Sequence, residues 1–450
     1  MNSVRFITFG CKANQYDTQV LREALLRRGW SERDQQADLV VLNTCTVTAE
    51  AGRKARQMAR RIAREQPSAR IAITGCLAES EPEILRELPG VEWVLGNGEA
   101  KLPVNFLRDL GLELDPEELG VPAGISEFAG HTRAFLKIQD GCDMACAFCI
   151  IPTVRGRSRS RPIAELTAEV RRLVASGHRE IVLCGIHIGH WGREIGSSLS
   201  SLIEAFCELE IEDEGGERLA WRVRLSSIEA TEVDADLLAR MRDRPDRVAT
   251  HLHMPMQSGD DEVLRAMNRW YTVAEYLAAC DRIRATLDRP AFSADLLVGF
   301  PGETEASFER TCATARAAGF SRIHVFPFSA RPGTAAAGRP TPPVAEVRER
   351  RARLAELGSE TATSYRASLD GSRDTILFEG GFTGLSGRYQ RIRVPPESLD
   401  GVPEGLLEVE LSLELDAEGQ SSLRGRPTAP PQDVAARAPA LAGSVEGGRP

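Results

Sequence analysis

Short apolar runs alternate with longer amphipathic stretches through the first hundred residues of the chain. Four runs predict strands, at Val4–Phe9, Asp38–Leu42, Ala69–Thr74 and Val91–Leu95. Helices are expected over about 14–28 and 81–88, and after the second strand apolar residues recur at helical spacing, at Ala55, Met58, Ala59 and Ile62. This strand–helix alternation predicts a parallel α/β sheet domain over residues 1–100.

The same alternation returns between residues 131 and 360. Six apolar runs predict strands, at Ala134–Gln139, Ile181–Gly185, Arg222–Ser226, Thr250–Met254, Phe292–Val298 and Arg322–Phe326. Six strand–helix units fall short of the eight units of a complete barrel. We therefore expect a partial (β/α)6 barrel as the central domain.

The remaining segments have other patterns. Residues 101–130 are acidic and contain several Pro and Gly residues, which predicts an irregular linker, and a charged helix is expected from Val344 to about Glu360. Apolar and polar residues alternate over 366–427, which predicts a small C-terminal β-barrel. Residues 428–450 are rich in Ala, Pro and Gly and are expected to form a disordered tail.

Composition narrows the setting in which the protein works. A net charge of −9 over 450 residues argues against a general binder of polyanions. No apolar run approaches the length of a membrane span, and the N-terminus has too short an apolar stretch for a secretory signal. Ten cysteines without an export signal indicate reduced thiols. We expect a cytoplasmic protein without a membrane partner.

One short loop after the first barrel strand carries three cysteines, Cys142, Cys146 and Cys149, at Cys-x3-Cys-x2-Cys spacing. Three thiolates this close can hold three corners of a 4Fe–4S cluster. No fourth cysteine stands in the stretch, so one iron would keep an open position for a small molecule. The alternative is a structural zinc site, although zinc sites of this kind usually close with a fourth Cys or His at short spacing.

Three more cysteines follow successive strands of the N-terminal domain. Cys11, Cys45 and Cys76 each stand just after a predicted strand. Because the carboxyl ends of parallel strands share one edge of a sheet, these thiols are expected to meet, beside helix N-termini that favour thiolates. Any one of them could instead be a small buried apolar residue. The shared position favours a second three-cysteine site.

The combination of two three-cysteine sites, two α/β domains and a small β-barrel resembles the methylthiotransferase family of radical S-adenosylmethionine (SAM) enzymes from Val4 to Arg426. The resemblance implies that Cys142, Cys146 and Cys149 hold the 4Fe–4S cluster that binds and cleaves SAM. It implies that Cys11, Cys45 and Cys76 hold an auxiliary 4Fe–4S cluster. The C-terminal barrel is similar to a TRAM domain, an RNA-contacting module.

Loops at the carboxyl ends of the barrel strands are candidates for contacts with SAM. They contain Gly185, Glu229 and Gln257, which we expect to bind the cofactor. Each of these polar, Gly-rich stretches could equally serve only to form a turn.

The resemblance also implies a reaction. Two SAM molecules would serve methyl transfer and radical formation, and a methylthio group would be placed on C2 of an adenosine derivative. The stretch Gly10–Thr18 is most similar to the branch that acts on N6-threonylcarbamoyladenosine at position 37 of tRNA, next to the anticodon. The implied partners are the anticodon stem-loop, a reductant such as flavodoxin or ferredoxin, and a sulfur donor.

Other functions remain open at this point. The isopentenyladenosine branch usually has Gln where Lys12 stands, and the branch that modifies an aspartate of a ribosomal protein lacks the Asn-Gln-Tyr-Asp run. A non-catalytic iron–sulfur electron carrier is a more distant alternative, and it would more often close each cluster with four cysteines.

Two basic stretches are candidate RNA contacts. The first follows the cluster loop and contains Arg155, Arg157, Arg159 and Arg161 with no acid among them. The second lies in the C-terminal barrel and consists of Arg388, Tyr389, Arg391 and Arg393. From residue 370 to 426 that barrel has six Arg against eleven Asp and Glu, so its overall charge does not favour RNA.

Overall fold

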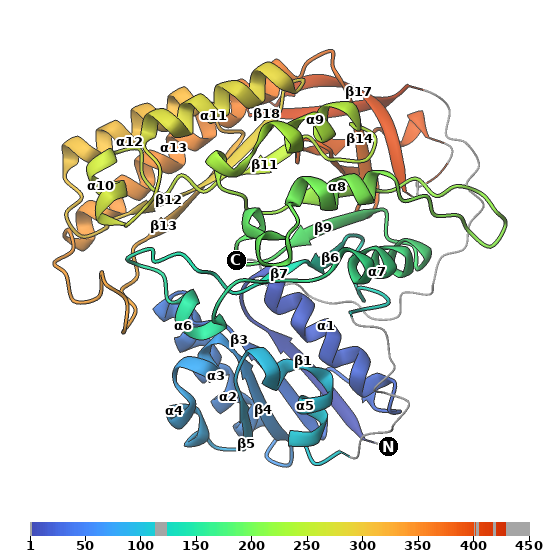
Figure 1. Cartoon of the computed structure of the whole chain (residues 1–450), viewed down its shortest axis with the longest axis vertical. Coiled ribbons are helices and arrows are strands. Elements are labelled where there is room, and N and C mark those ends of the chain that lie inside the picture. The colour runs from blue at the N-terminus through green and yellow to red at the C-terminus, as the bar shows by residue number, and fades with distance from the viewer. Residues whose placement is uncertain (1, 113–123, 400, 402–404, 417–419, 429–450) are drawn as a thin grey trace.

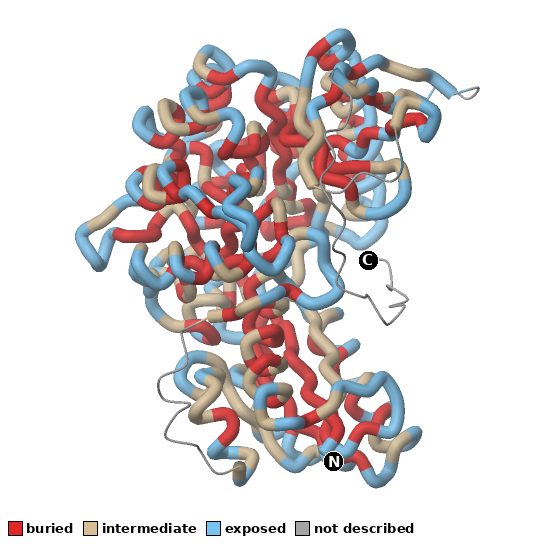
Figure 2. Tube along the Cα trace, turned by 90° about the vertical axis from the view of Figure 1, so that its right-hand side faces the viewer, coloured by how far each residue is buried: buried red, intermediate tan, exposed pale blue. Residues whose placement is uncertain are grey.

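The structure is a computed structural model that describes residues 2–112, 124–399, 401, 405–416 and 420–428. Three units follow one another along the chain (Figure 1). An N-terminal sheet domain lies at the lower end of the view, the partial barrel lies above it, and the small C-terminal barrel packs at the upper right. Buried residues run through the sheet domain and on into the partial barrel (Figure 2).

The N-terminal domain is a five-stranded parallel sheet with the order β2-β1-β3-β4-β5. Its strands are β1 (Ser3–Thr8), β2 (Ser31–Glu32), β3 (Leu39–Thr44), β4 (Arg70–Gly75) and β5 (Val91–Leu95). Its helices are α1 (Lys12–Leu26), α2 (Ala49–Glu65), α3 (Cys76–Ser80), α4 (Pro82–Arg86) and α5 (Pro103–Asp109). The central strand β3 is buried along its whole length, as expected for a parallel strand covered on both faces. Of these five strands, the short edge strand β2 was absent from the sequence prediction.

The expected linker over 101–130 is not irregular throughout. It begins inside the 3-10 helix η1 (Gly98–Lys101) and continues as α5, whose Phe106 is fully buried in the same apolar cluster as Leu21 and Leu25 of α1. This burial holds the segment against the sheet. The part of the prediction over 113–123 lies outside the described residues.

The central domain has the six expected parallel strands. They are β6 (Ala134–Lys137), β9 (Glu180–Cys184), β10 (Arg222–Leu225), β11 (His251–His253), β12 (Ala291–Val298) and β13 (Arg322–Pro327). They form two three-stranded sheets, β10-β9-β6 and β11-β12-β13, which a parallel bridge between Ser227 and His253 joins. The resulting curved sheet, β6-β9-β10-β11-β12-β13, leaves an open side between β6 and β13, so the partial barrel is confirmed.

Helices surround this curved sheet. They are α6 (Ile151–Arg155), α7 (Ile163–Ala175), α8 (Leu199–Cys207), α9 (Ala235–Asp243), α10 (Asp261–Ala266), α11 (Val273–Thr286) and α12 (Glu305–Ala318). Short 3-10 helices lie in the loops, at η3 (Ile188–His190), η4 (Arg193–Ile195) and η5 (Ala230–Glu232). A two-residue antiparallel pair, β7 (Gln139–Asp140) with β8 (Arg159–Ser160), closes the base of the loop with the three cysteines.

The C-terminal barrel is closed and has five strands. They are β14 (Arg373–Phe378), β15 (Thr383–Ser386), β16 (Arg391–Arg393), β17 (Leu406–Leu415) and β18 (Ser421–Pro427), with the 3-10 helix η6 (Pro396–Ser398) between β16 and β17. The connecting helix α13 (Val344–Ser368) continues past its expected end near Glu360, into the range predicted for the barrel. The disordered tail was expected over residues 428–450, and from residue 429 onward this range lies outside the described residues.

A buried ionic cluster fastens the two barrels together. Glu180 is fully buried and binds the guanidinium groups of Arg222 and Arg224 at 2.7 and 2.8 Å. The same guanidinium groups donate onward to main-chain oxygens of the C-terminal barrel, at Thr375, Leu385, Ser386 and Gly387. Burial alone would raise the pKa of Glu180, but the two arginines outweigh it and hold that pKa well below its usual range.

Within the described residues, no helix is both long enough and apolar enough to cross a membrane.

Candidate functional site

The carboxyl edge of the N-terminal sheet carries Cys11, Cys45 and Cys76. Cys11 caps the N-terminus of α1, Cys45 follows β3, and Cys76 opens α3 directly after β4. A Cβ atom built on Gly10 would lie only 2.8 Å from the Cβ of Cys45, so the first two loops are in close contact. Cys45 and Cys76 are buried and Cys11 is exposed, which leaves the site open on one side.

Glycine and asparagine residues shape this edge. Gly75 has φ of +97°, and a Cβ there would lie 2.4 Å from the carbonyl oxygen of Thr44, so a side chain would separate the β3 and β4 ends. Asn14 donates to the carbonyl oxygens of Phe9 and Thr44 at 2.8 and 2.9 Å and ties the first two loops together. The loops that carry the three cysteines are therefore held close together at this edge of the sheet.

The electrostatics of these thiols suit a metal cluster. Burial raises the pKa of Cys45 to about 11, with a contribution from Cys76 and Cys11, because each would repel a thiolate. A cluster removes this repulsion, because its irons neutralise the thiolates and its binding releases their protons. All three cysteines are free thiols, so the residues fit a 4Fe–4S cluster with three protein ligands.

The second set of cysteines lies in the loop between β7 and α6. Cys142 donates its N–H to the carbonyl oxygen of Gly156 at 3.0 Å, and the N–H of Met144 donates to Sγ of Cys142 at 3.4 Å. Gly141 has φ of +75°, and a Cβ there would overlap the carbonyl oxygen of Arg157. Burial raises the pKa of Cys149 to about 12, with a contribution from Cys146 and Cys142. Like the first set, these thiols fit a cluster with three protein ligands.

The two cysteine sites are neighbours. Ile150, the residue after Cys149, packs with Val154 of α6 against Cys76 in one small buried cluster. The sequence predicts each site separately, but it does not predict that they lie side by side. A group held by one set of cysteines would therefore lie near the other set.

Arg269 is a residue of the second site that the sequence prediction missed. It donates to Sγ of Cys146 at 3.4 Å and pairs with the carboxylate of Glu229. Burial raises the pKa of Glu229, although Arg269 opposes the rise. Arg269 stands 123 positions from Cys146, and no spacing in the sequence indicates that they meet.

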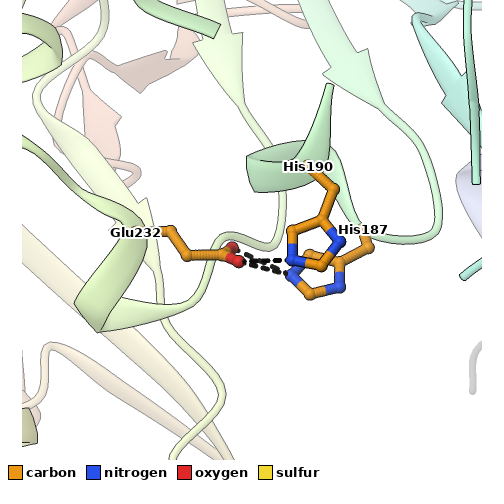
Figure 3. Close-up of side chains that lie close together, drawn as sticks. All are labelled: His187, His190 and Glu232. Carbon is orange, nitrogen blue, oxygen red and sulfur yellow. Dashed lines mark hydrogen bonds and ion pairs between the residues drawn. The ribbon is translucent and has the colours of Figure 1, made fainter. Parts of the chain in front are cut away.

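Two histidines and a glutamate form a second group beside the cysteine loop (Figure 3). The Nε2 atoms of His187 and His190 both lie 2.9 Å from carboxylate oxygens of Glu232, and the imidazole rings stack with centroids 3.7 Å apart. Nδ1 of His187 lies 3.7 Å from Sγ of Cys142. Burial would raise the pKa of Glu232, yet the two histidines lower it to about 2, so the carboxylate is charged and paired. No signal in the sequence indicated Glu232.

The other predicted SAM contacts lie at the expected strand ends. Gly185 follows β9, where a Cβ would lie 2.9 Å from the carbonyl oxygen of Gln139. Gln257 has φ of +61° and exchanges main-chain hydrogen bonds with Asp295 and Leu297 of β12. Their contact with SAM, like that of Glu229, stays a prediction.

The first basic stretch divides into exposed and buried arginines. Arg155 is 3% exposed, and its guanidinium binds Asp140 and Asp17 at 2.7 and 3.2 Å, so its prediction as an RNA contact is wrong. Arg161 is largely covered and binds Glu169 at 2.7 Å, which also makes it a structural residue. Arg157 and Arg159 are exposed. Only these two keep the predicted role of binding RNA.

The second basic stretch divides in the same way. Arg388 is 7% exposed and binds Asp288 and Asp374 at 2.9 and 3.3 Å, which contradicts its predicted RNA contact. The Tyr389 ring stacks on His251 with centroids 4.6 Å apart, so that face is not available to a base. Arg391 and Arg393 are exposed on β16 and remain predicted RNA contacts.

Comparison with known proteins places the chain in a family. A family model described as "Uncharacterized protein family UPF0004" matches residues 3–96, and one described as "Radical SAM superfamily" matches residues 136–315. The threonylcarbamoyladenosine tRNA methylthiotransferase MtaB of Bacillus subtilis is 37% identical over 398 residues, which cover 85% of this chain and 86% of that protein. The protein of the same name from Thermotoga maritima is 35% identical and covers 84% of this chain and 87% of its own length.

A relative with another name is similarly close. The tRNA-2-methylthio-N(6)-dimethylallyladenosine synthase of Cereibacter sphaeroides is 36% identical over 440 residues, which cover 93% of this chain and 97% of that protein. Among solved structures, the radical SAM methyltransferase TsrM of Kitasatospora setae superposes with a TM-score of 0.52 at 15% identity, over 72% of this chain and 73% of its own. That likeness confirms the fold.

The cofactors of this family match the geometry. A 4Fe–4S cluster with an open iron binds SAM and supplies the radical chemistry that acid–base side chains lack. The barrel cysteines fit this cluster and the N-terminal cysteines fit a second one. The chain thus belongs to the methylthiotransferase family of radical SAM enzymes, transferases that use SAM and two 4Fe–4S clusters.

Proposed function

We propose that this enzyme places a methylthio group on C2 of N6-threonylcarbamoyladenosine in tRNA, next to the anticodon. Two relatives that share most of the chain are named for this nucleoside, and a third is named for the dimethylallyl nucleoside. The two substrates differ in charge. The threonylcarbamoyl group ends in a carboxylate, whereas the dimethylallyl group is a neutral hydrocarbon.

Lys12 is the observation that favours the charged substrate. It follows Cys11, is half-buried, and its ammonium makes no hydrogen bond or ion pair within the described residues. Burial raises the pKa of Cys184 on β9 and lowers the pKa values of His251 on β11 and His324 on β13. The charge of Lys12 acts to lower all three pKa values, so it opposes the first shift and adds to the other two. Lys12 thus lies beside the auxiliary site, and its charge is felt by titratable groups on three strands of the partial barrel. A half-buried ammonium without an internal partner is well suited to bind a carboxylate.

The alternatives have less support. A dimethylallyl group would cover the half-buried Lys12 ammonium without offering it an acceptor, which is unfavourable. The electron-carrier alternative conflicts with two sites of three thiols each, because carriers more often close each cluster with four. An aspartate of a ribosomal protein also carries a carboxylate that Lys12 could bind, but the relatives that share most of the chain are named for tRNA nucleosides. A reductant and a sulfur donor remain predicted partners.

The proposal is tested by the nucleosides of tRNA from cells that lack this gene. Complementation with the unchanged gene should restore 2-methylthio-N6-threonylcarbamoyladenosine, measured by mass spectrometry. Lys12→Gln should leave most of the unthiolated nucleoside in place, because the carboxylate loses its partner. The control is Lys54→Gln, because Lys54 is exposed on α2 and already has a surface partner, Glu50, at 3.9 Å. A profile in which the gene changes only the dimethylallyl nucleoside would refute the proposal.

A further inference from the structure

A pocket of about 580 Å³ lies between α13, β13 and the C-terminal barrel, away from the cysteine sites. Five arginines line it, from four different segments: Arg133 before β6, Arg322 on β13, Arg351 and Arg366 on α13, and Arg391 on β16. Among the described residues that line the pocket, the only acid is Glu379. Glu379 is already bound by Arg133 at 2.7 Å.

The other four arginines have no carboxylate partner within the described part of the chain. The side chains of Arg322, Arg351 and Arg391 make no hydrogen bond or ion pair there, and all three are exposed. Arg366 donates only to the hydroxyls of Ser421 and Thr363, at 2.7 and 3.2 Å. Four uncompensated positive charges therefore meet in a chain whose net charge is −9. Such a local excess marks a surface that attracts an anion.

The wall formed by α13 gives the pocket its length. The lining residues of this helix recur at helical spacing, and small side chains separate the two arginines at Ala355, Gly358, Ser359 and Ala362. A Cβ on Gly358 would lie 3.2 Å from the Cβ of Ile323, so glycine lets the helix approach β13 closely. From Arg351 to Arg366 the helix rises about 22 Å. That span suits several phosphates of one polymer better than one small anion.

The position of the pocket relative to the cluster site supports the same ligand. Arg133 precedes β6 and Arg322 begins β13, so the pocket lies at the amino ends of the two strands that border the open side of the partial barrel. Cys142 lies beyond the opposite, carboxyl end. A strand of six residues spans roughly 20 Å. An RNA whose target nucleoside sits at the cluster would reach this pocket with its stem.

We propose that the pocket binds the phosphate backbone of the RNA substrate, several nucleotides from the modified base. This inference rests on the RNA substrate of the proposed function and adds a site to it. The Tyr389 ring in the pocket is already partnered, by His251 stacked on one face and by the guanidinium groups of Arg133 and Arg224 at 5.9 and 5.1 Å from its centroid. The arginines would therefore position the RNA without selecting its sequence. The arginines of the pocket and the exposed Arg157 and Arg159 would then hold the RNA at two separate places.

The test measures binding of the holoenzyme to a tRNA anticodon stem-loop by fluorescence anisotropy over a range of salt concentrations. The double variant Arg322→Gln/Arg351→Gln should make the negative slope of log K against log salt shallower by about 2, because each phosphate contact contributes about −0.9. If the variant and the unchanged protein bind equally at about 1 M salt, this difference in slope corresponds to about 30-fold weaker binding of the variant at 0.15 M salt. Circular dichroism should show an unchanged fold, because both side chains are exposed.

The matched control is Arg61→Gln/Arg86→Gln, which removes the same charge from two exposed and paired arginines of the N-terminal domain. An equal loss of affinity in the control would overturn the inference, because it would show a general effect of charge. So would an unchanged slope in the pocket variant. Weakening that is the same for stem-loops with and without the modified base supports the pocket. Loss of discrimination between those two RNAs in Lys12→Gln tests the proposed function alone.

Discussion

Asp17 is the residue whose substitution tests most sharply how the two cysteine sites are held together. It lies on α1 and is 5% exposed, and its carboxylate binds Lys101 of the same domain at 3.1 Å. It also binds Arg155 of α6 at 3.2 Å and Lys137 of β6. One carboxylate therefore joins the sheet domain to the strand and the helix on either side of the barrel cysteines. We predict that Asp17→Asn loosens this junction.

The magnitude follows from the burial. Burial alone would raise the pKa of Asp17, but Lys101, Lys137 and Arg155 outweigh it and hold that pKa well below its usual range. Removing the charge leaves three largely buried cations close together without the acid that they share. Loss of one partner of a buried ion pair typically costs about 3–5 kcal/mol, and we expect a change of that size in the free energy of opening.

The pH dependence has a definite sign. A carboxyl whose pKa is lowered in the folded state stabilises it fully above the ordinary Asp pKa of about 3.9, and the stabilisation is lost as the pH falls below that value. The difference in the free energy of opening between the unchanged protein and the Asp17→Asn variant should therefore be largest near neutral pH and shrink in acid.

Hydrogen-exchange mass spectrometry of the apo protein measures this opening in separate peptides from α1, β6 and α6. The control is Asp281→Asn, because Asp281 is 80% exposed and pairs with Arg284 on the surface, where such pairs contribute about 1 kcal/mol or less. Equal protection of α1 and β6 in both variants would refute the assignment of Asp17 as the joining residue.

Three further outcomes are expected. Glu180→Gln should destabilise the contact between the two barrels by about 3–5 kcal/mol, because Arg222 and Arg224 stay buried without their anion. Hydrogen exchange in increasing urea should show this loss as a lower urea midpoint for peptides from β14 to β18. Cys146→Ala should reduce bound iron to about half and abolish 5′-deoxyadenosine formation, measured by iron assay and chromatography. Cys45→Ala should also lose about half of the iron yet keep SAM cleavage. A fall in 5′-deoxyadenosine while the cluster of the barrel cysteines stays intact would contradict separate roles for the two sites.

Much of the fold follows from the sequence because its signals are local. The strands of both α/β domains appear as short apolar runs, and the ends of three N-terminal strands are marked by Cys11, Cys45 and Cys76. The rule that parallel strands share a carboxyl edge then predicts a common site without any distance. The missed β2 has only two residues, too few for a pattern to show.

The partners of the cluster loop could not be predicted in the same way. Arg269 and Glu232 reach the barrel cysteines or their neighbours from other strand–helix units, so only the folded chain brings them together. The sequence also shows charge without showing its partner. Arg155 and Arg157 look alike in the basic stretch, yet α6 turns the first toward Asp17 and Asp140 and leaves the second exposed.

The most direct test of the account is a reaction of the purified enzyme, with both clusters reconstituted, on two synthetic anticodon stem-loops. One carries N6-threonylcarbamoyladenosine and the other the dimethylallyl nucleoside, and each is incubated with SAM and a reductant. We predict the 2-methylthio product on the first RNA, together with 5′-deoxyadenosine, and an unchanged second RNA. A product on the dimethylallyl RNA alone, or SAM cleavage without a methylthio product on either RNA, would contradict the account.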